Sequence, residues 1–416
     1  MKQIYSKCVA LIRGLVLLSK IDEPQATVDS RRAEMLQFWS LWDEPQGETA
    51  ARSAVDRGLS CHAVLGGGLV KQGRPWTDEQ TAGVMELFHR QREALPSFGR
   101  WVNAVRPHAE SIRYPDQLVF MPVEAFKHEE LYWGVPKPST LFRSSGTGAQ
   151  SKALQGESSE EPQRSRHWMA YEADVMARAL RHAVHCLGNF QNCSLLALLP
   201  SYMEREESSL LAMLQYFMDH GDFQFGAFYR RDYGALMEQW ALAGQEGRST
   251  LVWGIPHALK DWFGDPQWKG RSWQVRPGDI LIETGGTKGM EQDWTPEGFR
   301  DWLRLQTKDS VGLRLSSEYG MTELGSQAYR IEGSVLEGFV FPASVGIGIY
   351  RSDNPLEWES AGARGGINIV DTSNYYSLAF IQTSDRGRIL PDGTLELLGR
   401  LEGAEARGCN MLNTGG

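Results

Sequence analysis

Residues 279–289, DILIETGGTKG, decide the fold class of this chain of 416 residues. The stretch begins as a compact apolar strand pattern and ends in a Gly-Gly turn. After it, TPEGFRDWLRLQ (295–306) has apolar residues at helical spacing, and Thr295 with Pro296 is typical of a helix start. A strand, a glycine turn and a helix in this order are typical of one unit of a parallel α/β sheet.

The same alternation continues on both sides of this unit. Helical spacing of apolar residues predicts helices within 164–187, 208–221 and 233–244. Apolar runs predict strands within 193–200, 223–229 and 250–255. Beyond about residue 335, short strands alternate with glycine and aspartate turns. We therefore predict the α/β class, with layered parallel sheets flanked by helices and a β-rich C-terminal portion.

The first 75 residues look unlike the rest, with short helical patterns and a glycine-rich break. We expect an N-terminal extension of uncertain fold at 1–75, a core at 76–400 and a short tail at 401–416. The apolar stretch CVALIRGLVLLSK (8–20) is interrupted by Arg13 and lacks a small-residue cleavage site, which favours an amphipathic helix or a loose leader over a signal peptide. It is too short to span a bilayer, so no membrane span is expected.

Composition excludes several classes of partner. The chain is 41% hydrophobic and 23% charged, as in folded globular proteins, and its net charge of −9 includes no basic block that would neutralise a nucleic acid backbone. The five cysteines are odd in number, scattered and never spaced as C-x-x-C. This pattern indicates free thiols in a reducing cytoplasm.

The segment LFRSSGTGAQSK (141–152) is a candidate phosphate loop. Its glycines free the backbone so that successive N–H groups can converge on an anion, and its hydroxyls can add donors. A serine-glycine surface loop is the alternative, since no Walker motif is present. The candidate ligands are Ser144, Ser145, Gly146, Thr147 and Gly148.

Two further segments hold polar groups suited to a nucleotide. In SSEYGMTELGSQ (316–327), Tyr319 can flank a purine, Thr322 can donate to a phosphate and Glu323 can hold Mg²⁺, which prefers one or two carboxylates plus phosphates. A solvated helix or loop face is the alternative for Glu318 and Glu323. In TSDRGRILPDGTLELLGR (383–400), Asp385 can accept two ribose hydroxyls, and an ordinary hairpin is the alternative.

Cysteine and histidine pairs elsewhere have simpler interpretations. Cys186 and Cys193 fall in apolar helix and strand patterns, which favours core packing. His182 and His185 lie three residues apart on a predicted helix, but no third ligand has convincing spacing, so we expect surface histidines and no metal site.

In this order, the segments resemble the core motifs of the adenylate-forming superfamily: the S-S-G-T-T-G loop, a T-G-G turn, Y-G-x-T-E, T-x-D and G-R. More narrowly, the chain resembles the acyl-protein synthetase family known from bacterial luminescence, which activates fatty acids for reduction to aldehyde. The closer signatures span about residues 80–411 and are FMPVEAFK, FRSSGTG, SRHWM, LLPSYMEREESSLLAM, ETGGTKG, YGMTELGSQ, GGINIVD and GRLEGAEARGCN.

The resemblance implies the large domain of that superfamily, with its small C-terminal domain absent or vestigial, and a ligase that uses ATP and Mg²⁺. Ser144 to Gly148 would wrap the β- and γ-phosphates, Thr322 would touch the α-phosphate, and Glu323 would bind Mg²⁺. Asp385 would bind ribose, with Arg400 nearby at a hinge. The adenine slot would comprise Thr284, Gly285, Gly286, Thr287, Glu318, Tyr319, Gly320 and Met321.

It also implies a substrate and an acyl acceptor. The substrate would be a carboxylic acid of the fatty acid type, and the acceptor would be the thiol of Cys409, with Arg407 favouring the thiolate. A reductase would be the partner protein. His167, in the SRHWM signature, would line the acyl or phosphate pocket or pack in the core.

Two alternatives stay open. One is a ligase similar to phenylacetate-CoA ligases, with coenzyme A or a carrier protein as acceptor, and the other is a catalytically weak module that binds nucleotide or a partner. Two differences from the family pattern bear on activity: S-S-G-T-G is one threonine short, and the polar segment 149–164 separates it from SRH.

Overall fold

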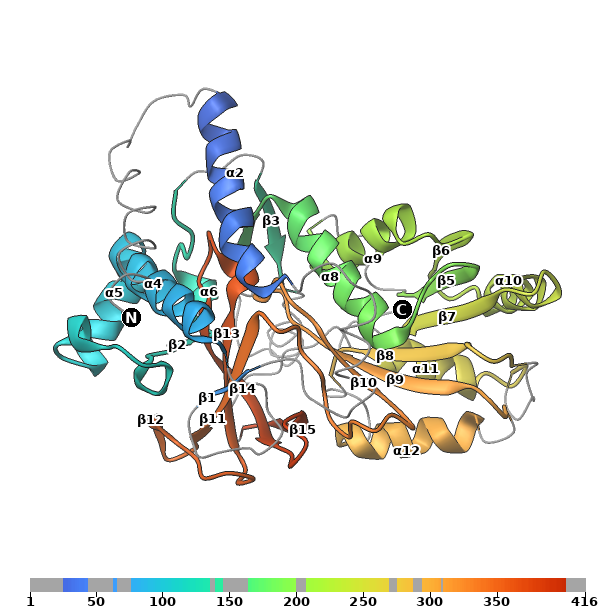
Figure 1. Cartoon of the computed structure of the whole chain (residues 1–416). Helices are drawn as coiled ribbons and strands as arrows, with labels where there is room; N and C mark the ends of the chain where they lie inside the picture. The colour runs from blue at the N-terminus through green and yellow to red at the C-terminus, as the bar shows by residue number, and fades with distance from the viewer. Residues whose placement is uncertain are drawn as a thin grey trace, which may run out of the picture.

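A computed structural model describes residues 25–43, 63–65, 76–134, 139–144, 164–199, 207–268, 275–286, 294–307 and 310–401. Within these ranges the chain forms a six-stranded sheet, a seven-stranded sheet and a two-stranded hairpin, with helices packed around them (Figure 1). This arrangement confirms the predicted α/β class. Most of the parallel strand pairs lie in the six-stranded sheet.

The six-stranded sheet has the order β10-β9-β8-β7-β5-β6. Its first five strands along the chain are parallel, and only β10 runs antiparallel to its neighbour. The central strands are buried on both faces, which explains their continuous apolar runs. The strands are β5 (Cys193–Leu198), β6 (Phe225–Tyr229), β7 (Ser249–Gly254), β8 (Ile280–Thr284), β9 (Arg314–Tyr319) and β10 (Ala328–Ile331).

Helices cover both faces of this sheet. In Figure 1, α8 (Glu172–Leu187) and α9 (Ser209–His220) lie above it, and α12 (Pro296–Thr307) lies below. Two further helices pack on the sheet: α10 (Tyr233–Gln245) contacts β5, β6 and β7, and α11 (Pro256–Gly264) contacts β8. The predicted start of α12 is confirmed, with the Thr295 hydroxyl accepting a hydrogen bond from the Gly298 amide at 3.0 Å. No helix in the described ranges has the length and apolar character needed to cross a membrane.

The seven-stranded sheet confirms the β-rich C-terminal portion. Strands β11, β13, β14 and β15 are antiparallel, and β1, β2 and β12 pair with β11 or β14. Their bounds are β1 (Ala63–Leu65), β2 (Met121–Pro122), β11 (Val345–Arg351), β12 (Asn354–Trp358), β13 (Gly365–Asp371), β14 (Phe380–Ile389) and β15 (Leu395–Arg400).

Two helices from the N-terminal half pack on this second sheet. The rings of Phe88, on α4 (Asp78–Ala94), and Phe98, on α5 (Pro96–Val105), lie 5.1 and 6.0 Å from the ring of Phe380. All three are fully buried, so aromatic burial fixes the helices on the sheet. The smaller elements are η2 (Ser40–Trp42), η3 (Ala109–Ser111), η4 (Pro115–Gln117), α6 (Ala125–His128), β3 (Ser139–Arg143), β4 (Arg166–Ala170) and η5 (Thr372–Asn374).

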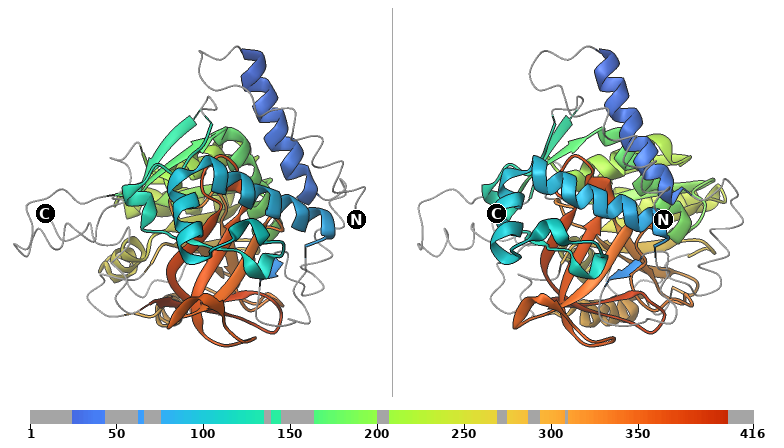
Figure 2. Two further views of the ribbon diagram at one scale, coloured as in Figure 1. Left: turned by 90° about the vertical axis from the view of Figure 1, so that its left-hand side faces the viewer. Right: turned by 60° about the vertical axis from the view of Figure 1, so that its left-hand side comes forward.

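Part of the region expected to be an N-terminal extension is a helix, α2 (Gln25–Trp39), that docks on the rest of the protein. Figure 2 shows it rising from the side of the molecule in blue. The indole N–H of Trp39 donates to the Thr372 carbonyl at 2.9 Å, and Arg32 binds the Asp174 carboxylate through two hydrogen bonds of 2.7 Å. The limits of the extension, core and tail stay a prediction.

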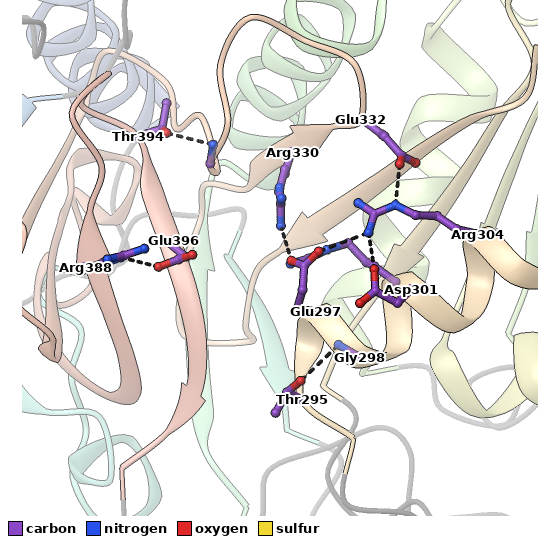
Figure 3. A network of polar contacts seen from close by, with 12 residues as sticks. Thr295, Glu297, Gly298, Asp301, Arg304, Arg330, Glu332, Arg388, Thr394 and Glu396 are labelled. Atoms are coloured by element: carbon purple, nitrogen blue, oxygen red, sulfur yellow. Dashed lines mark hydrogen bonds and ion pairs between the residues drawn. The ribbon is translucent and has the colours of Figure 1, made fainter.

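Charged side chains tie α12 to the edge of the six-stranded sheet (Figure 3). The Glu297 carboxylate binds Arg300, lies 3.0 Å from Arg330 and 3.2 Å from Arg304, and Arg304 also binds Glu332 and Asp301. Partial burial raises the pKa of Glu297, but the hydrogen bonds from Arg300 and Arg330 outweigh it and lower the pKa to about 2.

Glu297→Gln should lower the free energy of unfolding by about 1 kcal/mol at pH 7, because Glu297 is half exposed and water screens its ion pairs. A carboxylate with a depressed pKa stabilises the fold above its unfolded pKa, so this contribution should disappear as pH falls from about 5 towards 2. Urea unfolding at several pH values measures both effects. Asp301→Asn, which removes one exposed partner of Arg304, is the control and should change stability less.

Candidate functional site

The parallel strands bring the candidate residues to one edge of the six-stranded sheet. The carboxyl ends of β5, β7, β8 and β9 all open there, and strand order reverses between β5 and β7, because β6 lies on the other side of β5. Such a switch point is where open α/β sheets bind ligands. Thr284 and its Gly-Gly turn follow β8, and Tyr319 to Glu323 follow β9 at this edge.

The T-G-G turn meets Glu318 directly. The Thr284 hydroxyl donates to the Glu318 carboxylate, and the two residues face each other across β8 and β9. Gly285 has a φ of +88°, which favours glycine, and a Cβ added to Gly286 would meet no atom within 4 Å. The turn therefore presents bare backbone to open space, as the approach of a planar base requires.

The two acidic residues of the Y-G-x-T-E segment, Glu318 and Glu323, are buried in the protein. Glu318 is 7% exposed and Glu323 is 1% exposed, so the alternative of a solvated face is wrong for both. A Cβ on Gly320 would lie 2.5 Å from Oε1 of Glu318, so a side chain at this position would displace that carboxylate. Burial raises the pKa of Glu318 to about 7, against the opposing hydrogen bond from Thr284, and the nearby charge of Glu283 adds to the rise.

A second contact joins the two large sheets at the site. The Tyr319 hydroxyl, at the end of β9, donates to Oδ2 of Asp385 on β14 at 2.8 Å. Arg400 faces Asp385 across β14 and β15, with its Nε 3.6 Å from Oδ1. The ring of Tyr319 packs against Phe339 and Phe341, at centroid distances of 6.0 and 5.8 Å. The candidate segments 316–327 and 383–400 thus contact each other at one place.

His167 lies at the same site in the interior of the protein. It is 1% exposed, and its imidazole packs edge-on against Phe126 at 5.7 Å. Nδ1 lies 2.7 Å from the Thr322 carbonyl, which only accepts, so Nδ1 carries the hydrogen. Burial lowers the pKa of His167, outweighing the opposing effects of the Thr322 hydrogen bond and of the Glu323 and Asp371 charges. The imidazole is therefore neutral near neutral pH.

The phosphate loop is described only at its first residue. The Ser144 amide donates to the Ser165 carbonyl at 3.1 Å, and the Ser144 hydroxyl accepts from the Ser165 amide at 2.9 Å. These two bonds join Ser144 to Ser165 just before β4, and we call this pair of residues the neck of the phosphate loop. Ser145, Gly146, Thr147, Gly148, Thr287 and Cys409 lie outside the described residues, so their roles stay predictions.

Asp371 and Asn374 belong to the site although sequence reasoning did not select them. Asp371 ends β13 within the GGINIVD signature, and its carboxylate accepts from the amides of Gly325 and Ser326, both at 2.9 Å. Asn374 donates to the Glu323 carbonyl at 2.8 Å. The sequence did contain a signal for Asp371, because an acidic residue at the end of an apolar strand pattern is a common ligand position.

The described residues contain no cluster of three or more histidine, cysteine or acidic side chains that could hold a metal ion. The buried carboxylate of Glu323, beside Thr322, is of the type that Mg²⁺ prefers, since this ion is commonly bound by one or two carboxylates plus substrate phosphates. The expectation that His182 lies on the surface is wrong: it is buried, with Nε2 3.0 Å from the Val340 carbonyl. Cys193 is buried as predicted, and Cys186 is half-buried.

No protein-family model and no curated protein matches this chain. Several solved structures are similar to this chain at low identity. Apo MatB from Rhodopseudomonas palustris is 14% identical, covers 89% of this chain and 73% of its own, and has a TM-score of 0.41. For a 2-hydroxyisobutyryl-CoA ligase in complex with 2-HIB-AMP and CoA, the values are 11%, 94%, 74% and 0.44.

A third similar structure is the adenylation domain of a keto acid-selecting NRPS module bound to keto acyl adenylate. It is 12% identical, covers 66% of this chain and 54% of its own, and has a TM-score of 0.43.

The raised pKa of Glu318 predicts an inverse dependence of stability on pH. Because the folded state holds this proton more tightly than the unfolded state, stability should fall as pH rises from about 4.5 to 7. Glu318→Gln should remove about 1–3 kcal/mol of that fall, measured by urea unfolding at pH 5 and pH 8. Glu238→Gln, at an exposed position of α10, is the control. Identical pH profiles for wild type and Glu318→Gln would contradict this assignment.

Proposed function

We propose that this protein is an ATP-dependent ligase that activates a carboxylic acid of the fatty acid type as acyl-AMP and transfers the acyl group to a thiol. One arrangement supports this above all. The candidate segments meet through side-chain contacts: Thr284 with Glu318, Tyr319 with Asp385, and His167 with Thr322. These contacts join residues that are 34, 66 and 155 positions apart in the sequence, which neither a surface loop nor an ordinary hairpin explains.

The nucleoside would bind between the T-G-G turn and Tyr319. The open backbone at Gly286 and the aromatic ring of Tyr319 suit the two sides of a planar purine. Asp385 is a carboxylate suited to the ribose hydroxyls, and its hydrogen bond from Tyr319 and its proximity to Arg400 hold its orientation.

The phosphates would lie between the Ser144–Gly148 loop and Thr322. A carboxylate oxygen of the substrate attacks the α-phosphorus of ATP, the bond from that phosphorus to the bridging oxygen breaks, and pyrophosphate leaves with the electron pair. Glu323 would hold Mg²⁺, which neutralises charge on the phosphates. Thr322 would donate its hydroxyl to the α-phosphate, where charge is redistributed during attack.

The second step would transfer the acyl group to Cys409. The thiolate attacks the acyl carbon, the bond from that carbon to the phosphate oxygen breaks, and AMP leaves. The resemblance to acyl-protein synthetases supports this acceptor and a reductase that consumes the thioester in the cytoplasm. Coenzyme A or a carrier protein is the competing acceptor.

ATP–pyrophosphate exchange over a panel of short, medium and long carboxylic acids tests the first step. The wild type should exchange label only when a suitable acid is present. Thr322→Val and Glu323→Gln should each lower the exchange rate by about 10- to 1000-fold, as removal of a transition-state contact does. Glu238→Gln should exchange normally. Complete absence of exchange in the wild type with every acid would overturn the proposed function.

Labelling with radioactive acid and ATP tests the acceptor. Protein-bound label that hydroxylamine releases should form on the wild type and disappear in Cys409→Ser, while ATP–pyrophosphate exchange continues. Cys186→Ser serves as the matched control and should keep its label. Unchanged label in Cys409→Ser would exclude Cys409 and favour another acceptor.

A further inference from the structure

The loop that carries Thr322 and Glu323 is irregular, yet most of it is buried. Residues 323–326 are all buried and belong to no helix or strand. Backbone groups buried outside regular structure need partners elsewhere, because an unpaired buried N–H or C=O is costly. The partners of this loop, from Thr322 to Ser326, come from two distant parts of the chain.

Two side chains bind consecutive carbonyl groups of this loop. His167 donates from Nδ1 to the Thr322 carbonyl at 2.7 Å, and Asn374 donates from Nδ2 to the Glu323 carbonyl at 2.8 Å. Asn374 is itself fixed, since Nδ2 also donates to the Leu378 carbonyl at 2.9 Å. The carbonyls of both residues proposed to touch phosphate and metal are therefore held in place.

One carboxylate binds the other half of the loop. Oδ2 of Asp371 accepts from the Gly325 and Ser326 amides, and Oδ1 accepts from the Ser326 hydroxyl at 2.8 Å and from the Ser373 amide at 3.0 Å. A Cβ added to Gly325 would lie 2.8 Å from the Cβ of Ser373. The loop thus lies directly on the segment that follows β13.

We infer that His167, Asp371 and Asn374 are positioning residues, which hold the Thr322–Ser326 backbone so that the side chains of Thr322 and Glu323 point at the phosphates and the metal. This inference rests on the proposed function. His167 also links two parts of the site, because its strand β4 begins beside the neck of the phosphate loop at Ser144 and Ser165. Its neutral imidazole keeps a single N–H for Thr322, in agreement with its lowered pKa.

Two substitutions of His167 separate positioning from packing. The amide nitrogen of Asn stands the same number of bonds from the backbone as Nδ1 of His, so His167→Asn keeps a donor for Thr322 but loses the ring contact with Phe126. His167→Phe keeps a ring and loses the donor. If His167 only packs, Phe is the milder substitution; if it positions the loop, Asn is.

In the exchange assay, His167→Phe should lower kcat by about 10- to 100-fold with little change in KM for ATP, since misplaced groups act on the transition state more than on binding. His167→Asn should recover most of this loss. Equal kcat in His167→Phe and wild type, or a greater loss in His167→Asn than in His167→Phe, would overturn the inference. Thermal unfolding of both variants shows whether lost rate follows lost stability instead.

Hydrogen exchange of the Thr322–Ser326 amides gives a readout that does not depend on turnover. His167→Phe and Asp371→Asn should each speed this exchange by about tenfold or more, while His167→Asn stays close to wild type. If the Thr322–Ser326 amides exchange as slowly in His167→Phe and Asp371→Asn as in the wild type, the inference is overturned and the proposed function stays intact. Absence of ATP–pyrophosphate exchange in the wild type overturns the proposed function and the catalytic role of these residues with it.

Discussion

The buried carboxylate of Asp371 is the constraint on which the site depends. A fully buried carboxylate is tolerated only when hydrogen bonds replace its water, and Asp371 has them from Gly325, Ser326 and Ser373. Gly325 and Ser326 lie in the loop after β9 and Ser373 lies in η5, so satisfying one charge fixes the course of both segments at once. Removing a single donor would leave part of that charge unpaired, which costs more than the bond itself contributes.

This constraint operates where the two large sheets meet. Asp371 ends a strand of the seven-stranded sheet, and two of its donor residues, Gly325 and Ser326, follow a strand of the six-stranded sheet. Tyr319 and Asp385 repeat the pattern, one from each sheet, at 2.8 Å. Under the proposed function, the base would lie on the glycine turn of one sheet and the ribose on the hairpin of the other. The relative placement of the sheets therefore sets the geometry of the site.

Much of the fold follows from local patterns in the sequence. Strands such as β5, β7 and β8 are continuous apolar runs because both of their faces are covered, and α12 begins where Thr295 and Pro296 predict. Polar residues that depend on distant partners were harder to place. Glutamate is usually exposed, so the sequence does not predict that Glu318 is buried. In the structure its carboxylate accepts a hydrogen bond from Thr284 and lies beside Gly320, which has no side chain.

Asp371 and Asn374 were missed for the same reason. Their partners lie 46 and 51 residues away in sequence, beyond any periodicity that a helix or strand imposes. His182 was expected at the surface because helical spacing says which residues share a face but not which face is covered. The phosphate loop beyond Ser144 and the thiol of Cys409 stay predictions, since they lie outside the described residues.

The docking of α2 has a consequence for how the protein is assembled. Trp39 binds the Thr372 carbonyl across 333 residues of sequence, and the Tyr376 hydroxyl donates to the Arg31 carbonyl across 345. On a ribosome, where the chain emerges from its N-terminus, α2 cannot make these contacts before residues 372–376 have been made. The segment that it covers includes Asn374, which binds the Glu323 carbonyl. The site therefore becomes complete only after residues 371–376 have been made, so a chain that stops before them would lack its geometry.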